Sequence, residues 1–86
     1  MKEVNGYRVQ ILATKNIETA SLYEQEATER LQGYDHKTYL IFEAPLYKIR
    51  VGDCKTRLEA ESVREIMEDY GYRETFIVKS KIRIME

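Results

Sequence analysis

The stretch "YKIRVGDCKTRLEA" at residues 47–60 closely repeats the stretch "YRVQILATKNIETA" at residues 7–20. Each copy begins with alternating side chains, which is typical of a β-strand whose two faces meet different surroundings. Each copy then has a residue that caps helices, Asn16 in the first and Thr56 in the second. The repeat therefore predicts a strand followed by a helix, twice in one chain.

The segments after these strands have helical periodicity and recognisable ends. In the second copy, Thr56 and Glu59 form a capping box. Gly33 and Gly71 suit the left-handed conformation that closes helices. The two apolar stripes are formed by Ile17, Ala20, Tyr23, Ala27 and Leu31, and by Ala60, Val63, Ile66, Met67 and Tyr70. A short apolar run follows each helix, at 37–42 and 74–78, and each run predicts a further strand.

This order, β-α-β-β-α-β, predicts an α+β fold of the ferredoxin-like type. Right-handed crossovers place both helices on one face of a four-stranded antiparallel sheet and leave the other face uncovered. We expect an extension at residues 1–6, the domain at 7–79, and at 80–86 a tail or a short edge strand. A chain of 86 residues has room for one such domain.

Alternation predicts which side chains occupy the uncovered face. Val9, Ile11, Ile49 and Val51 are expected beneath the helices. The opposite phase then points outward, with Gln10 and Lys48 in the solvent. The expected outward residues are Arg8, Gln10, Leu12, Tyr39, Ile41, Leu46, Lys48, Arg50, Phe76 and Val78. Such a mixture of apolar and hydrogen-bonding groups suits a carbohydrate, although an ordinary solvated sheet face has the same pattern.

Charge and composition exclude several other functions. Fourteen basic and 15 acidic residues give a formal net charge of −1, so no broad positive field favours nucleic acid or an anionic membrane. We expect no membrane insertion by this segment, because no stretch is long and apolar enough. The single cysteine, Cys54, is expected to be buried, and His36 to lie in a turn. We therefore expect no catalytic group, cofactor or metal.

Several of these segments together resemble the sporulation-related repeat, or SPOR, domain of bacterial envelope proteins. They are "YRVQI", "YKIRVGDCKTRLEA" and the Gly-Tyr pairs at 33–34 and 71–72; "EAPLYKIRVGDCKTRLEAE" with "FIVKSKI" is particularly similar to Bacteroidetes versions. The resemblance implies a noncatalytic, periplasmic domain of the cell envelope that binds peptidoglycan, favouring glycan strands whose stem peptides amidases have removed. It also implies division or wall-remodelling proteins as partners, and targeting of a parent protein to the septum.

The resemblance also implies which residues bind. The glutamine of the family's first-strand motif matches Gln10, the basic residue of the third-strand motif matches Lys48, and an apolar position of the last strand falls near Phe76. Leu46 stands where an aromatic residue is frequent, so Tyr39 or Tyr47 is a candidate for the missing ring; Ala13 replaces a hydroxyl-bearing residue of some relatives. The candidate binding residues are Gln10, Lys48, Leu46, Phe76, Arg8, Arg50 and Tyr39.

Two other uses of an open sheet are alternatives. An RNA-binding module of the RRM type has the same topology, but it reads RNA with aromatic side chains on its central strands. This chain is expected to project Arg8, Gln10 and Leu12 from one of them and Leu46, Lys48 and Arg50 from the other. A protein-interaction domain remains open on sequence grounds, because Ile41, Leu46 and Phe76 are apolar. An acylphosphatase-like enzyme is disfavoured, since residues 12–16 contain no glycine-rich anion cradle.

Overall fold

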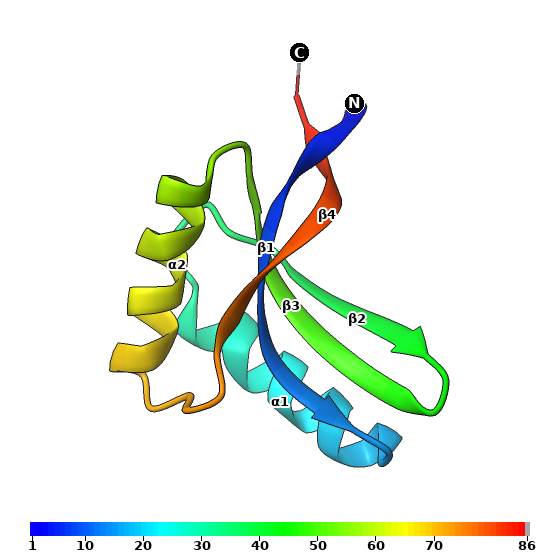
Figure 1. Cartoon of the computed structure of the whole chain (residues 1–86). Coiled ribbons are helices and arrows are strands. Elements are labelled where there is room, and N and C mark those ends of the chain that lie inside the picture. The colour runs from blue at the N-terminus through cyan, green and yellow to red at the C-terminus, as the bar shows by residue number, and fades with distance from the viewer. Residues whose placement is uncertain (86) are drawn as a thin grey trace.

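The computed structural model describes residues 1–85 and has the predicted β-α-β-β-α-β order (Figure 1). The elements are β1 (Lys2–Thr14), α1 (Ile17–Arg30), β2 (Thr38–Glu43), β3 (Leu46–Cys54), α2 (Arg57–Asp69) and β4 (Phe76–Ile84). The strands form one antiparallel sheet in the order β2-β3-β1-β4. Both helices cover the same side of the sheet (Figure 1). The ferredoxin-like α+β prediction is confirmed.

The core lies between the two helices and the helix side of the sheet. The sheet contributes the four residues expected there, Val9, Ile11, Ile49 and Val51. The first helix contributes Ala20 and Ala27, its C-cap residue is Leu31, which is also buried, and the second helix contributes Ala60, Val63 and Met67. Ile17, Tyr23 and Tyr70 are each more than one third exposed. The expected stripes are therefore wider than the buried faces of the helices.

Both helices begin at the residues that the sequence predicts. The Asn16 side chain accepts a hydrogen bond from the Thr19 N–H at 2.9 Å. The Thr56 hydroxyl oxygen accepts one from the Glu59 N–H at 3.1 Å, and the Glu59 carboxylate accepts one from the Lys55 N–H. These bonds satisfy amide groups that have no partner within the helix, and so define where each helix starts.

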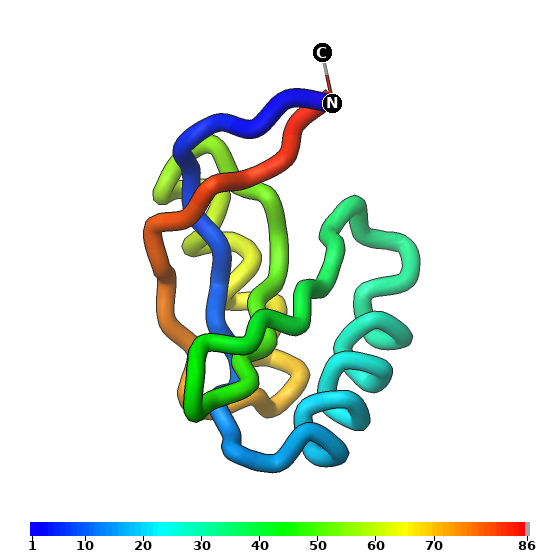
Figure 2. Tube along the Cα trace, turned by 90° about the vertical axis from the view of Figure 1, so that its right-hand side faces the viewer, coloured from blue at the N-terminus to red at the C-terminus, as the bar shows by residue number. Residues whose placement is uncertain are grey.

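The central strand β1 and the edge strand β4 are longer than the sequence pattern indicates. β1 starts at Lys2, and β4 continues to Ile84, so the C-terminal segment extends β4. The two strands pair from Lys2–Ile84 to Gln10–Phe76 and form a twisted ribbon whose ends lie together (Figures 1 and 2). The boundaries 7–79 for a binding domain stay a prediction.

Two irregularities in the pairing of β1 with β3 change the direction of later side chains. Tyr7 pairs with Cys54 and Val9 with Val51, so β3 has one extra residue there, at Gly52 (φ +88°) or Asp53. Farther along, Gln10 pairs with Arg50 and Leu12 with Ile49, so β1 has an extra residue. Extra residues of this kind reset strand alternation locally.

The outward direction expected for Leu12 is wrong. Leu12 lies opposite Ile49 and packs against the core, and Ala13 lies opposite Lys48 instead. Strict alternation from Arg8 and Gln10 puts Leu12 on the open face, but the extra residue at Ile11 shifts the phase by one. The extra residue in β1 is the physical reason, because it moves the outward-facing position from Leu12 to Ala13.

Candidate functional site

The open face of the sheet has four polar side chains at its centre. Val9, Ile49 and Val51 point into the core, so Arg8 and Gln10 of β1 and Lys48 and Arg50 of β3 lie on the opposite side. The edge strands place Tyr39 opposite Arg50, Ile41 opposite Lys48, Phe76 opposite Gln10 and Val78 opposite Arg8. Together with Leu46, all seven candidate binding residues lie on this face.

Gln10 lies on the open face but not in the solvent, contrary to the sequence expectation. Only 6% of its surface is exposed. Its side-chain oxygen accepts a hydrogen bond from Arg50 Nε at 3.1 Å. A side chain at the middle of a sheet is covered by its neighbours on the adjacent strands, which alternation alone does not reveal. In this conformation Gln10 orients Arg50.

Arg8 and Tyr39 are held together by Asp53. The Arg8 guanidinium lies 3.8 Å from the centre of the Tyr39 ring, and its Nη2 donates to Asp53 Oδ1 at 3.0 Å. The Tyr39 hydroxyl donates to the other Asp53 oxygen, and the Arg83 N–H donates to Oδ1 at 3.1 Å. One carboxylate thus links side chains of three strands with the backbone of the fourth.

The contacts around Asp53 shift the pKa values of the Asp53 carboxyl and the Tyr39 hydroxyl. Burial alone would raise the pKa of the Asp53 carboxyl, but the hydrogen bonds from Tyr39, Arg83 and Arg8 and the charge of Arg8 hold it below its ordinary value. Burial, and then the hydrogen bond to Asp53, raises the pKa of the Tyr39 hydroxyl. Asp53 is therefore ionised and Tyr39 is neutral at pH 7.

A second group of charges lies nearer the β2–β3 hairpin. Lys48 Nζ donates to Glu43 Oε1 at 2.6 Å, and Arg50 Nη2 lies 3.6 Å from the same oxygen. The hydrogen bond from Lys48 and the charges of Lys48 and Arg50 lower the pKa of the Glu43 carboxyl. Two cations here share one carboxylate, which leaves a local excess of positive charge.

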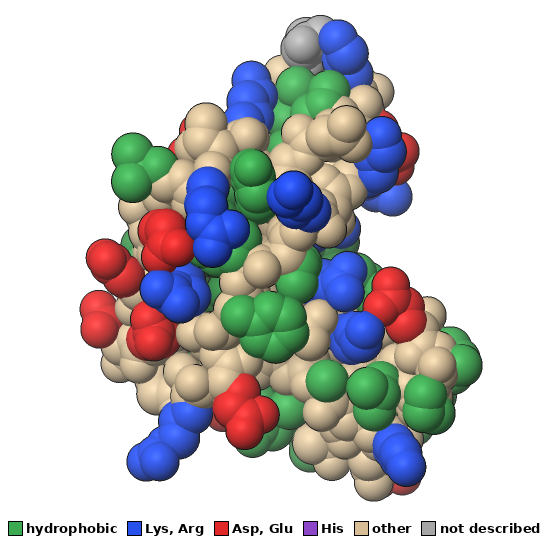
Figure 3. Space-filling model, viewed as in Figure 1, with side chains coloured by type: hydrophobic (Ala, Val, Ile, Leu, Met, Phe, Trp, Pro, Cys, Tyr) green, Lys and Arg blue, Asp and Glu red, His purple; other side chains and the backbone are tan. Residues whose placement is uncertain are grey.

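Apolar side chains flank these charges on both edge strands and at the start of β3. Phe76 on β4 is 49% exposed, while Ile41, Leu46 and Val78 are half-buried. In the space-filling view, apolar, basic and acidic side chains lie side by side on the lower half of the molecule (Figure 3). Tyr47, one candidate for the missing ring, lies instead on the helix side, 4.7 Å from the Phe42 ring centre.

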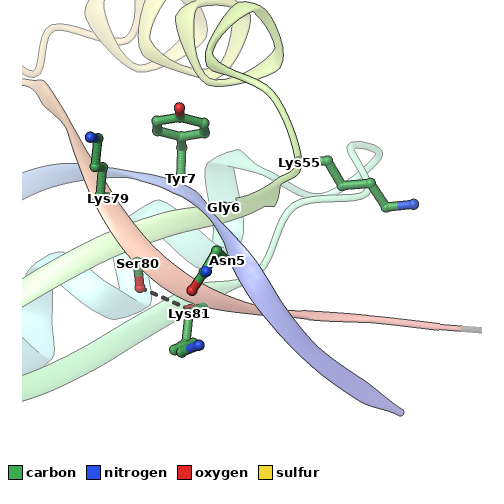
Figure 4. A pocket seen from close by; sticks show the side chains of 7 residues that line it. All are labelled: Asn5, Gly6, Tyr7, Lys55, Lys79, Ser80 and Lys81. Carbon is green, nitrogen blue, oxygen red and sulfur yellow. Dashed lines mark hydrogen bonds between the residues drawn. The ribbon is translucent and has the colours of Figure 1, made fainter.

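A surface hollow also lies near the upper ribbon, lined by Asn5, Gly6, Tyr7, Lys55, Lys79, Ser80 and Lys81. Its three lysine side chains point in different directions (Figure 4). Tyr7 packs against the core, so part of this hollow belongs to the helix side. A ligand site needs polar groups that converge on one position, and therefore the open face is the better candidate.

Other reactive groups lie apart from the open face. Cys54 is buried, and burial together with the charges of Glu59 and Asp53 raises the pKa of its thiol to about 11. His36 lies in the loop between α1 and β2, where its ring stacks on Tyr34. Within residues 1–85, no three metal-binding side chains come together, and neither helix is long and apolar enough to cross a membrane.

The family model of the SPOR domain matches residues 3–79. The chain belongs to the SPOR family. SPOR domains bind peptidoglycan and are associated with the cell wall, so this is a family of binding domains. Comparisons with curated proteins and with solved structures gave no match.

Two acidic residues of this SPOR domain's open face were missed by sequence reasoning. Glu43 is in phase with Tyr39 and Ile41, so alternation extended by one step into the hairpin finds it. For Asp53, strand alternation does not predict a position on the open face. Strict alternation from Arg50 would point Asp53 toward the helices, and only the extra residue in β3 turns it to the open face.

Proposed function

We propose that this SPOR domain binds the glycan strands of peptidoglycan through the open sheet face, and that it prefers strands without stem peptides. In this proposal Phe76 and Leu46 pack against the C–H faces of sugar rings, and Lys48 and Arg50 bind polar substituents. The observation that carries the proposal is the exposed Phe76 ring on the same face as these two cations.

The proposal assigns different roles to the seven candidate residues. Lys48, Leu46 and Phe76 contact the glycan directly. Gln10 positions Arg50 through the 3.1 Å hydrogen bond. Asp53 holds Arg8 and Tyr39, which form the border of the site on the side away from the β2–β3 hairpin. A site whose side chains are already fixed loses less conformational entropy on binding.

This binding would bring a parent protein to the part of the wall where bare glycan is present. We propose that place to be the division septum, with division or wall-remodelling proteins as partners, and the periplasm as the location. RNA binding by the same face is less well supported, because the aromatic residues of the two central strands, Tyr7 and Tyr47, pack against the core and not on this face.

The test is sedimentation of the domain with insoluble peptidoglycan before and after amidase treatment. We expect more bound protein after treatment. Phe76→Ala is expected to weaken binding by about 1 kcal/mol, because it removes an exposed aromatic contact. Leu22→Ala is the matched control, since Leu22 is 66% exposed on α1, on the other side of the sheet. Sedimentation in neither sample would refute the proposed function.

A further inference from the structure

We propose that Lys48 and Arg50 form a subsite for a carboxylate of the glycan, and that Glu43 occupies this subsite when no glycan is bound. The inference rests on the proposed function and names the chemical group that the site recognises. It starts from the position of Glu43 Oε1, which lies 2.6 Å from Lys48 Nζ and 3.6 Å from Arg50 Nη2.

The side chains of Lys48 and Arg50 are held more firmly than the side chain of Glu43. The Lys48 and Arg50 side chains are 21% and 13% exposed, and both lie on the central strand β3. Arg50 is also fixed by its hydrogen bond to Gln10. The Glu43 side chain is 52% exposed and belongs to the last residue of an edge strand. Rotation of Glu43 toward solvent would therefore uncover two prearranged cations without moving the sheet.

Lys48, Arg50 and Glu43 together carry an excess of positive charge, which favours the binding of an anion. Lys48 and Arg50 supply two positive charges, and Glu43 supplies one negative charge. The other basic residue at the centre of the face, Arg8, is paired with Asp53. Hydrogen bonds between cations and carboxylates are the stronger kind in proteins, so a ligand carboxylate is the group that best replaces Glu43.

Glycan strands carry such a carboxylate only where the stem peptide is absent. The peptide is joined to the lactyl ether of every second sugar by an amide. Hydrolysis breaks the C–N bond, adds water, and leaves a carboxylate on the sugar and an amine on the peptide. An intact strand presents a neutral amide and a bulky peptide at the same place. The subsite therefore gives the proposed preference for bare strands an electrostatic cause.

The experiment compares two soluble probes by isothermal titration calorimetry. The first is a set of glycan oligomers released from amidase-treated peptidoglycan, with free lactyl carboxylates. The second is the same oligomers after their carboxylates have been coupled to methylamine. We expect the unmodified domain to bind the first probe several-fold more tightly. Glu43→Gln is expected to tighten binding of the first probe by up to about 5-fold, the range of an exposed ion pair, and to leave the second unchanged.

Matched variants separate this effect from a general change of charge. Glu65→Gln removes the same charge from the exposed surface of α2, and we expect no change in binding of either probe. Lys48→Gln is expected to abolish the preference for the carboxylate, while Lys79→Gln, on β4 opposite Tyr7, is expected to keep it. Thermal denaturation of each variant checks that the fold is intact.

The possible results distinguish the two proposals. Equal affinity for both probes, unchanged by Glu43→Gln, would overturn the carboxylate subsite and leave glycan binding in place. Binding of neither probe would overturn both proposals. A gain with Glu43→Gln that is equal for both probes would mean that Glu43 only obstructs the face, which also contradicts the carboxylate subsite.

Discussion

Asp53 is the residue on which the upper half of the open face depends. Its two carboxylate oxygens accept from Arg8, from the Tyr39 hydroxyl and from the Arg83 N–H. Asp53 is partly buried and Arg8 is buried. Removal of such a hydrogen-bonded charge is costly because its partners are left without compensation. At the residue scale, therefore, Asp53 has a larger structural role than any of the predicted binding residues.

We predict that Asp53→Asn lowers the free energy of unfolding by about 1–3 kcal/mol, the cost of leaving buried polar partners unsatisfied. Urea denaturation at pH 7 measures this change. Asp69→Asn, at the exposed end of α2, is the matched control and should have little effect. An Asp53→Asn variant as stable as the parent would show that Asp53 does not hold Arg8 and Tyr39 in place.

The same carboxyl group gives a pH dependence of defined sign. The folded pKa of Asp53 is lower than its unfolded value, so its stabilising effect is fully present above the unfolded pKa of about 4. The effect is lost as the pH falls through the folded pKa. The stability difference between the unmodified domain and Asp53→Asn should therefore shrink below about pH 4. A difference that stayed constant down to pH 2 would contradict this assignment.

The β1–β4 ribbon is the element that departs most from the sequence pattern. An added Cβ at Gly6 would lie 2.5 Å from the Cys54 carbonyl oxygen and 2.5 Å from Ile82 Cδ1. Gly6 therefore allows the ribbon to pack closely against the end of β3. Here a glycine inside a strand marks the close approach of another backbone.

We predict that Gly6→Ala destabilises the domain by about 1–3 kcal/mol, as overpacking generally does. The neighbouring backbone carbonyl of Cys54 cannot rotate away as a side chain can. Gly33→Ala is the comparison, because Gly33 has φ +94° but no atom within 4 Å of the added Cβ; only the left-handed backbone opposes this change, which should cost about 1 kcal/mol. Thermal and urea denaturation of both variants would test this order, and the reverse order would refute the close-packing argument.

At the scale of the whole molecule, residues 80–84 are part of the packed structure. Ile82 is fully buried, and the Arg83 N–H binds Asp53. The first residues of β1 and the last residues of β4, Lys2 and Ile84, pair at the tip of the ribbon (Figure 2), at a distance from the β2–β3 hairpin (Figure 1). A partner attached to either terminus would therefore leave the lower part of the open face accessible.

We predict that Ile82→Ala lowers the free energy of unfolding by about 2–5 kcal/mol, as for other large-to-small changes at buried positions. Ile84→Ala, two residues farther along the same strand and only half-buried, is the matched control and should cost less. Equal and small effects of both would show that the end of β4 contributes little to the fold.

The repeated strand and helix pattern was enough to predict the element order, the helix caps at Asn16 and Thr56, and the core residues Val9, Ile49 and Val51. These features follow from local periodicity and from hydrogen bonds between residues close in the sequence. The direction of Leu12 and Asp53, the burial of Gln10 and the sharing of Glu43 by two cations were decided only by the tertiary structure. They depend on extra residues in the strand pairing and on neighbours from other strands, neither of which leaves a periodic signal in the chain.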